Sequence, residues 1–186
     1  MEGKLVRIRA YEKSDLDAVM TWINDEEVTR NLGAPLIYPL SRALEEKYLE
    51  ARGNTAGGSD PDCRWAIETL GGDYLGGISL MSIDWIDRSA QVGIVIGIKV
   101  HWGKGYGTDA MRAVLRFAFD KMNLHRVWLN VYGFNQRGIK SYEKCGFKRE
   151  GVLREYRFID GKYHDAILMA VLEQEYRVRR KAGDAY

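Results

Sequence analysis

Cysteine, proline and histidine are scarce in this sequence, and their scarcity excludes several classes of protein. The two cysteines, Cys63 and Cys145, lie far apart and lack the spacing of a metal site. We interpret both as reduced thiols, which are typical of a cytoplasmic protein. The three histidines share no spacing either, so we expect no metal. With 20 glycines but only three prolines, the glycines are expected at turns and in a ligand loop rather than in a linker.

An excess of one charge and long apolar runs are also missing. The chain carries 28 basic and 26 acidic residues, a net charge of +2, which gives no electrostatic reason to expect nucleic-acid binding. No apolar run is long enough to cross a membrane, and residues 1–4 lack the features of a signal peptide. We therefore expect a cytoplasmic protein that binds neither nucleic acid nor a membrane.

Length and composition indicate an ordinary globular protein. With 186 residues, of which 46% are hydrophobic and 29% charged, the chain can bury a sizeable core. We expect a single domain over residues 1–186, with its core at about 4–176 and a flexible tail at 177–186.

Hydrophobic periodicity predicts an α/β (α+β) domain built on one mixed sheet. The predicted order is strand, helices, three strands, helix, strand, helix and two strands. Ser14 and Ser41 are predicted N-caps, and Asp160-Gly161 between two alternating apolar runs predicts a hairpin. Strands are predicted at 4–10, 63–70, 74–83, 90–100, 126–131, 147–159 and 162–172, and helices at 14–22, 25–31, 41–51, 109–122 and 135–145.

A glycine-rich run at 101–108 stands between a predicted strand and a predicted helix. Glycine lets the backbone approach a ligand closely, and the N–H groups of a first helical turn have no acceptor inside the helix. Such a junction is typical of a phosphate or pyrophosphate site. Gly103, Gly105 and Gly107 match neither the dinucleotide fingerprint nor a P-loop, and the run alone also fits a tight strand–helix turn.

A second cluster, at 135–147, follows this run along the chain. Asn135 is the predicted N-cap of its helix and Gly146 the predicted stop. Tyr142 lies three residues after Ile139 on one helix face, which also fits a plain core position, and we interpret Cys145 as a packing residue. The two clusters together are far more specific than either alone.

The order of elements and these motifs resemble the GNAT superfamily of N-acetyltransferases. The similarity covers essentially the whole chain and is closest to the branch that includes ribosomal-protein N-terminal acetyltransferases and spermidine acetyltransferases. It implies one mixed, mostly antiparallel sheet of about seven strands flanked by helices. The residues that carry the resemblance lie at 102–108, 123–126, 135–147 and 151–154, and from 161 to 165.

The resemblance implies a binding site for acetyl-CoA. The strand around Ile96 and Ile98 is expected to pair with the pantetheine arm, and Asn135 to contact the coenzyme A moiety. Trp102 departs from the family pattern, which has Gln or Arg at that position. The backbone amides expected to hold the pyrophosphate are those of Gly103, Lys104, Gly105, Tyr106, Gly107 and Thr108.

The same resemblance implies transfer of the acetyl group to a primary amine by direct attack in a ternary complex. The amine must shed a proton, and the leaving thiolate must gain one. Tyr142 matches the tyrosine beside the sulfur and is the predicted acid. Gln91 stands where relatives often have a glutamate base, which leaves Glu68, Asp84 or a water held by Asn130 as candidates.

Several alternatives stay open on the sequence. The missing base also fits a non-catalytic acyl-CoA-binding module or sensor, and the glycine run alone fits another nucleotide-binding protein. The acceptor is a protein N-terminus, a polyamine or a small antibiotic-like amine. Loops at 31–39 and 52–62 are expected to shape the site that binds it. The acidic run Asp25–Glu27 either attracts a cationic amine or merely solvates a helix. A homodimer is possible by analogy with the family.

Overall fold

The structure, a computed structural model, describes residues 1–32, 38–53 and 62–183. Its strands form one seven-stranded sheet in the order β1-β2-β3-β4-β5-β7-β6. β4 and β5 run parallel, and the other neighbouring pairs are antiparallel. The prediction of a mixed, mostly antiparallel sheet is confirmed. The strands are β1 (Val6–Arg9), β2 (Cys63–Thr69), β3 (Tyr74–Asp84), β4 (Ser89–Ile96), β5 (Arg126–Tyr132), β6 (Lys148–Ile159) and β7 (Lys162–Leu172).

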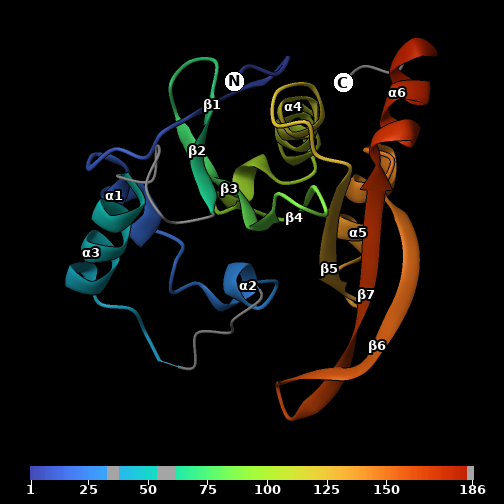
Figure 1. The fold of residues 1–186 in the computed structure, drawn as a ribbon. Coiled ribbons are helices and arrows are strands. Elements are labelled where there is room, and N and C mark those ends of the chain that lie inside the picture. The colour runs from blue at the N-terminus through green and yellow to red at the C-terminus, as the bar shows by residue number, and fades with distance from the viewer. Residues whose placement is uncertain (33–37, 54–61, 184–186) are drawn as a thin grey trace.

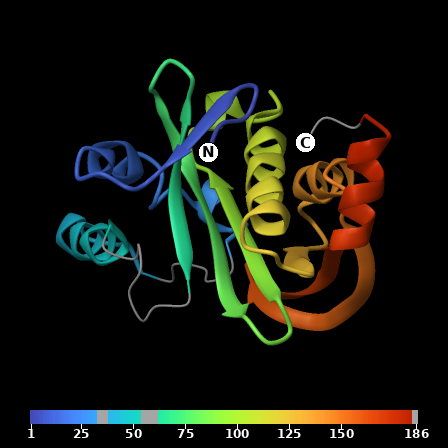
Figure 2. The same cartoon turned by 45° about the horizontal axis from the view of Figure 1, so that its top comes forward.

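Helices cover both faces of this sheet (Figure 1). In Figure 2, α1 and α3 lie on one side of β2, β3 and β4, and α4 lies on the other. α6 packs on α4, since the Tyr176 and Phe119 rings stack with centroids 4.9 Å apart. The helices are α1 (Asp15–Met20), α2 (Glu26–Thr29), α3 (Arg42–Gly53), α4 (Tyr106–Asp120), α5 (Gln136–Lys144) and α6 (Glu173–Lys181), with a short 3-10 helix η1 (Lys99–His101).

Two hydrophobic clusters correspond to the two faces. On the α4 side, Met111, Val114 and Leu115 are fully buried at helical spacing against the strands. On the other side, a smaller cluster joins α1, α2 and α3. It contains Leu16, Val19, Trp22, Ile23, Val28 and Leu49. Hydrophobic side chains therefore pack against both faces of β3 and β4.

The start of α1 differs from its prediction. Ser14 occupies the N-cap position, but its side chain caps no helical N–H. Asp15, the first residue of α1, reaches back instead, and its carboxylate accepts the N–H of Glu12 before the helix at 2.9 Å. Ser41 does bond the Leu44 N–H, at 3.3 Å, as predicted for a cap.

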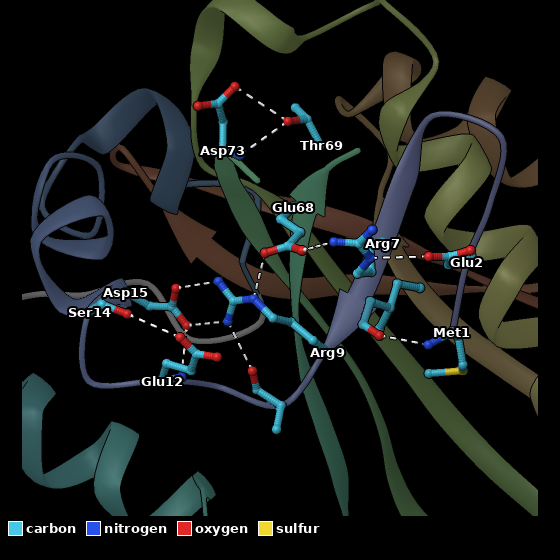
Figure 3. A network of polar contacts seen from close by, with 12 residues as sticks. Met1, Glu2, Arg7, Arg9, Glu12, Ser14, Asp15, Glu68, Thr69 and Asp73 are labelled. Atoms are coloured by element: carbon cyan, nitrogen blue, oxygen red, sulfur yellow. Dashed lines mark hydrogen bonds and ion pairs between the residues drawn. The ribbon is translucent and has the colours of Figure 1, made fainter. Parts of the chain in front are cut away.

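A network of charged side chains ties α1 to the sheet (Figure 3). Arg9 of β1 donates two hydrogen bonds to Asp15, both 2.8 Å long, and one of 2.6 Å to Glu68 of β2. Arg7 reaches the same Glu68 at 3.2 Å. Asp15 and Glu68 are 3% and 6% exposed. Because these bonds join charged partners in a largely buried place, they hold α1 firmly over β1 and β2.

The C-terminal part both confirms and corrects the sequence prediction. Asp160 and Gly161 have φ angles of +52° and +76°, which suit the predicted two-residue hairpin turn between β6 and β7. The tail expected to be flexible from 177 is helical to Lys181 instead. Arg177 and Arg180 of α6 form ion pairs with Asp120 of α4, which accounts for this order. Among the described residues, none of the helices combines the length and apolar character that a membrane crossing requires.

Candidate functional site

β4 and β5 separate in the middle of the sheet. Their parallel ladder joins only Ser89–Gln91 to Arg126–Trp128, although both strands, which the structure describes in full, continue to Ile96 and Tyr132. The second half of β4 therefore has no sheet partner on β5, and its backbone groups on that edge are left for other partners. Two cavities lie at this opening.

The first cavity, which we call the loop cavity, has a volume of about 480 Å³. It lies between the end of β4, the glycine-rich loop at 102–105, the start of α4, and α5. Most of the residues predicted to hold the donor line it. These are Ile96, Gly103, Gly105, Tyr106, Gly107, Thr108 and Asn135, together with Tyr142.

The loop uses two glycines in the left-handed region of backbone space. Gly103 and Gly105 have φ angles of +74° and +92°, which other residues rarely adopt. α4 begins at Tyr106, earlier than predicted, and its first described bond runs from the Asp109 N–H to the Gly105 carbonyl at 2.9 Å. The N–H groups of the first turn, at 106–108, thus have no acceptor within the helix. They form a site suited to an anion beside the cavity.

Trp102, the departure from the family pattern, joins three elements. Its indole N–H donates to the Ile96 carbonyl at the end of β4, at 2.6 Å. The guanidinium of Arg137 from α5 lies 3.7 Å from the centre of the Trp102 ring. Burial lowers the pKa of Arg137. A cation this close to an aromatic face is attracted to it. Trp102 thereby fixes the loop to both β4 and α5.

α5 is positioned as the sequence predicts. The Asn135 carboxamide oxygen accepts the Gly138 N–H at 2.9 Å, which confirms the N-cap, and Gly146 has a φ of +92°, as expected for the helix stop. The hydroxyls of Thr108 and Ser141 lie 2.8 Å apart, so α4 and α5 keep a fixed register.

Two residues that are predicted to bind acetyl-CoA do not line the loop cavity, and one residue that is not predicted to bind it does. β4 ends at Ile96 and the chain turns into η1, so Ile98 packs against the hydrophobic cluster that contains Trp22 and does not line the loop cavity. Lys104 does not line it either. His101 does, and its Nδ1 is buried without a hydrogen-bond partner in the described part of the chain.

The second cavity, which we call the sheet cavity, has a volume of about 430 Å³. Its floor is the face of β3 and β4 opposite α4, where Gly77, Ser79 and Gly93 leave room. α1 and α3 cover it, with Trp22 following α1. The two cavities share five lining residues, Asn31, Leu32, Ile94, Val95 and Tyr142. They therefore meet where β4 leaves β5, beside the Tyr142 side chain.

Two glycines admit the aromatic side chains of the sheet cavity. A Cβ on Gly97 would lie 2.3 Å from the Trp22 ring, and one on Gly77 would lie 2.0 Å from the Tyr11 hydroxyl. Neither Tyr11 nor Trp22 is predicted from the sequence as a site residue. Glycine within a strand often marks such a close approach, but it does not tell which distant side chain fills the space.

Burial changes the acidity of two groups on α5 and its end. It raises the pKa of Tyr142 and that of the Cys145 thiol, each to about 12. Both groups are therefore protonated at neutral pH. The Cys145 thiol points at the Thr108 carbonyl, 3.5 Å away, which agrees with its interpretation as a packing residue.

The candidate bases differ in whether they line one of the two cavities. Glu68 belongs to the network around Arg9, and Asp84 accepts N–H bonds from the turn that follows β3, so neither lines a cavity. Gln91 and Asn130 do line the sheet cavity. The Asn130 side-chain oxygen is buried, and no partner for it occurs among the described residues.

The acidic run at the start of α2 lines neither cavity. Asp25 caps α2, and both Asp25 and Glu27 pair with Lys99, at 2.7 and 3.0 Å. Asp25 and Glu27 thus have a cationic partner within the chain, Lys99 of η1. The loops predicted to shape the acceptor site lie largely in 33–37 and 54–61, outside the described residues. No group of residues suited to a metal ion occurs within 1–32, 38–53 and 62–183.

Comparison with known proteins decides the family. A family model described as an acetyltransferase (GNAT) domain matches residues 6–148. The chain belongs to the GNAT acetyltransferase family. A spermidine N(1)-acetyltransferase of Vibrio cholerae serotype O1 is 32% identical over 174 residues, which cover 91% of this chain and 94% of that protein. The corresponding enzyme of Escherichia coli K12 is 33% identical over 118 residues, 63% of this chain and 62% of its own length.

Solved structures agree with this assignment. The crystal structure of a Vibrio cholerae spermidine N-acetyltransferase in complex with CoA and spermine matches with a TM-score of 0.80 and 28% identity, covering 92% of this chain and 98% of that one. This acetyltransferase therefore has the GNAT fold and depends on acetyl-CoA for its N-acetyl transfer. The loop cavity fits an anionic donor, because Arg137, Lys140 and Lys144 line it beside the N–H groups at 106–108.

Proposed function

We propose that this acetyltransferase moves the acetyl group of acetyl-CoA directly to a primary amine of a polyamine, with donor and acceptor bound together. The observation that carries the proposal is the meeting of the loop cavity and the sheet cavity at Tyr142, Ile94 and Val95. A donor in one cavity and an amine in the other can touch there without a covalent enzyme intermediate. The polyamine is supported by the relatives, which are named spermidine acetyltransferases, one of them solved with spermine.

The loop cavity is our proposed donor site. The amides of Gly103, Gly105 and the first turn of α4 are suited to the pyrophosphate, because they combine free N–H groups with the positive end of the α4 dipole. The unpaired edge of β4 up to Ile96 is suited to the amide groups of the pantetheine arm. Asn135, whose oxygen is used in capping, keeps its side-chain amide N–H₂ for the donor.

Tyr142 is our proposed acid. Its raised pKa of about 12 keeps a proton on the phenol throughout the neutral range. Full transfer of that proton to a free thiolate, whose acid has a pKa of about 8.5, would be unfavourable by about 5 kcal/mol. Tyr142 must therefore give its proton while the C–S bond breaks and recover one from the attacking amine, in the manner of a relay.

The base is the second part of this relay. An alkyl amine has a pKa of about 10.4 and arrives protonated. Since Gln91 cannot take a proton, we propose that a water held by the Asn130 side-chain oxygen passes this first proton on to bulk solvent. The second proton, which the amine loses as it attacks the thioester, is the one that Tyr142 recovers. The reacting carbonyl oxygen would then face an unpaired N–H of β4, an interaction often worth about 3 kcal/mol.

A non-catalytic acyl-CoA-binding module is not favoured. Such a module needs a donor cavity but no second cavity that meets it at a tyrosine, and the relatives are named enzymes. A homodimer and a cytoplasmic location remain predictions from the resemblance and the composition.

An acceptor screen tests the proposal. Purified protein and acetyl-CoA are mixed with spermidine, spermine, an N-terminal peptide or an aminoglycoside, and thiol release and product mass are followed. We expect acetylated spermidine or spermine at a kcat/KM at least about tenfold above that of the peptide, because polyamines bring slender, cationic chains to the sheet cavity. Tight coenzyme A binding with no acetylated amine would instead support the binding module.

Trp102 provides a test of the donor site. Trp102→Phe should raise the Kd for coenzyme A about 3- to 10-fold, because it removes the hydrogen bond to the Ile96 carbonyl and leaves that carbonyl without its partner. The phenyl ring still offers Arg137 a face, so the protein should stay folded. Titration calorimetry measures the effect, with Trp85→Phe, at an exposed turn, as the control. An unchanged Kd would show that Trp102 does not contribute to coenzyme A binding.

A further inference from the structure

One end of the sheet cavity combines a buried carboxylate with tyrosine rings. Glu45 of α3 is 4% exposed and lines this cavity together with Tyr11, Tyr48 and Tyr74. Of the lining residues that the structure describes, Glu45 is the only acidic one. A carboxylate that lines a cavity attracts a cationic group of a ligand, and it can keep its contacts within the protein while it does so. A carboxylate at this place is therefore suited to a ligand group that carries positive charge.

The rings beside Glu45 are neutral and fixed in place. Burial raises the pKa of Tyr74, and Tyr74 shares a hydrogen bond with Tyr11 and an electrostatic interaction with Glu45. The Tyr11 hydroxyl occupies the space that a Cβ on Gly77 would fill. Aromatic rings attract cations to their faces, most strongly where water is excluded. The rings and the carboxylate thus favour the same kind of ligand group.

The strand register places this end of the cavity close to the reaction point. Gly77 of β3 pairs with Val95 of β4, and Val95 is one of the residues where the two cavities meet. Neighbouring strands are about 4.8 Å apart. The Tyr11 hydroxyl over Gly77 therefore lies about one strand away from Val95. An acceptor that reacts at the meeting point can reach it with a short alkyl spacer.

The other end of the cavity holds an arginine whose charge is balanced by a carboxylate. Arg64 of β2 lines it there, bonded to the Asp62 carboxylate and to the Met81 sulfur at 3.7 Å. Met81 lies near the end of β3, whereas Tyr74 lies at its start. A cationic group of the acceptor is therefore favoured at Glu45 over the Arg64 end of the cavity.

We propose that Glu45, with the rings of Tyr11 and Tyr74, binds a second ammonium group of the acceptor while the first amine reacts beside Tyr142. The enzyme then selects amines with another positive charge a short alkyl spacer away. This inference rests on the proposed acetyl transfer to polyamines and assigns the residues that recognise them. A purely structural Glu45, which only holds α3 on the sheet, would affect every acceptor alike.

A matched pair of acceptors tests this selection. 1,4-Diaminobutane and 4-amino-1-butanol have the same length, but only the first carries a second ammonium. We expect the wild type to favour the diamine by at least about tenfold in kcat/KM. Glu45→Gln should lower kcat/KM for the diamine about 10- to 100-fold and change the amino alcohol less than about twofold, because a charged hydrogen bond is lost only with the diamine.

Two further variants serve as a control and as an independent test. Glu46→Gln removes the same charge from an exposed position of α3 and should leave the preference intact. Tyr11→Leu should lower the preference about threefold or more through loss of the ring face, and it provides an independent answer if Glu45→Gln does not fold. Equal losses for both acceptors in either cavity variant would overturn the proposal.

Direct binding separates this proposal from the proposed reaction. The diamine is titrated by calorimetry into protein saturated with coenzyme A, with the amino alcohol as control. Diamine binding that Glu45→Gln abolishes would support the subsite even if no amine were acetylated, in which case the reaction alone would be refuted. A wild type that binds both compounds equally, or neither, would refute the subsite.

Discussion

Replacing Tyr142 by phenylalanine is expected to lower kcat by at least about 100-fold and to leave the Kd for coenzyme A within about twofold. The kinetic loss follows because a positioned acid commonly accelerates a reaction by about 10²–10⁴-fold. The Kd should hold because the ring remains, and its contact with Phe147, at a centroid distance of 6.0 Å, needs no hydroxyl. Steady-state kinetics with spermidine and calorimetry with coenzyme A measure the two quantities separately.

The pH dependence sharpens this test. Since the pKa of Tyr142 is raised from its usual value near 10 to about 12, the phenol stays protonated at pH 10. We therefore expect no falling limb of kcat centred near pH 10 in the wild type. Tyr163→Phe, at an exposed position of β7, is the control and should keep full activity. A Tyr142→Phe enzyme with kcat within about threefold of the wild type would remove Tyr142 from the acid role.

Much of the fold follows from local signals in the sequence. Asp160-Gly161 predicts the last hairpin because both residues tolerate positive φ, and Gly146 ends α5 for the same reason. Glycine positions likewise mark the loop before α4. Such signals act within a few residues, so neither the rest of the chain nor the ligand is needed to interpret them.

Contacts between distant segments account for what the sequence did not predict. The apolar alternation of β4 continues to Ile98, but the sheet ladder ends at Ile96, whose carbonyl is bonded by Trp102. The Tyr11 and Trp22 side chains enter the sheet cavity over glycines of β3 and of the segment after β4. Periodicity cannot pair residues so far apart in the chain, so the acceptor side of the site emerged only from the structure.

The same kind of distant contact governs stability, and Arg9 offers the largest expected effect. Arg9→Met should lower the free energy of unfolding by about 3–5 kcal/mol, because it leaves Asp15 and Glu68, two nearly buried carboxylates, without their main counter-charge (Figure 3). For a chain of this size the midpoint of thermal unfolding should fall by roughly 10 °C. Urea and thermal unfolding followed by circular dichroism measure both changes.

Arg7→Met is the matched control, since Arg7 contacts the same Glu68 but its side chain is 45% exposed. A surface ion pair of this kind contributes little to stability. If Arg9→Met cost no more than Arg7→Met, the network in Figure 3 would not hold α1 on the sheet. If Arg9→Met lowers the free energy of unfolding strongly, we also expect weaker binding of the acceptor amine. α1 carries Val19 and leads into Trp22 over the sheet cavity, so loosening the helix should raise the KM for the amine before the enzyme unfolds.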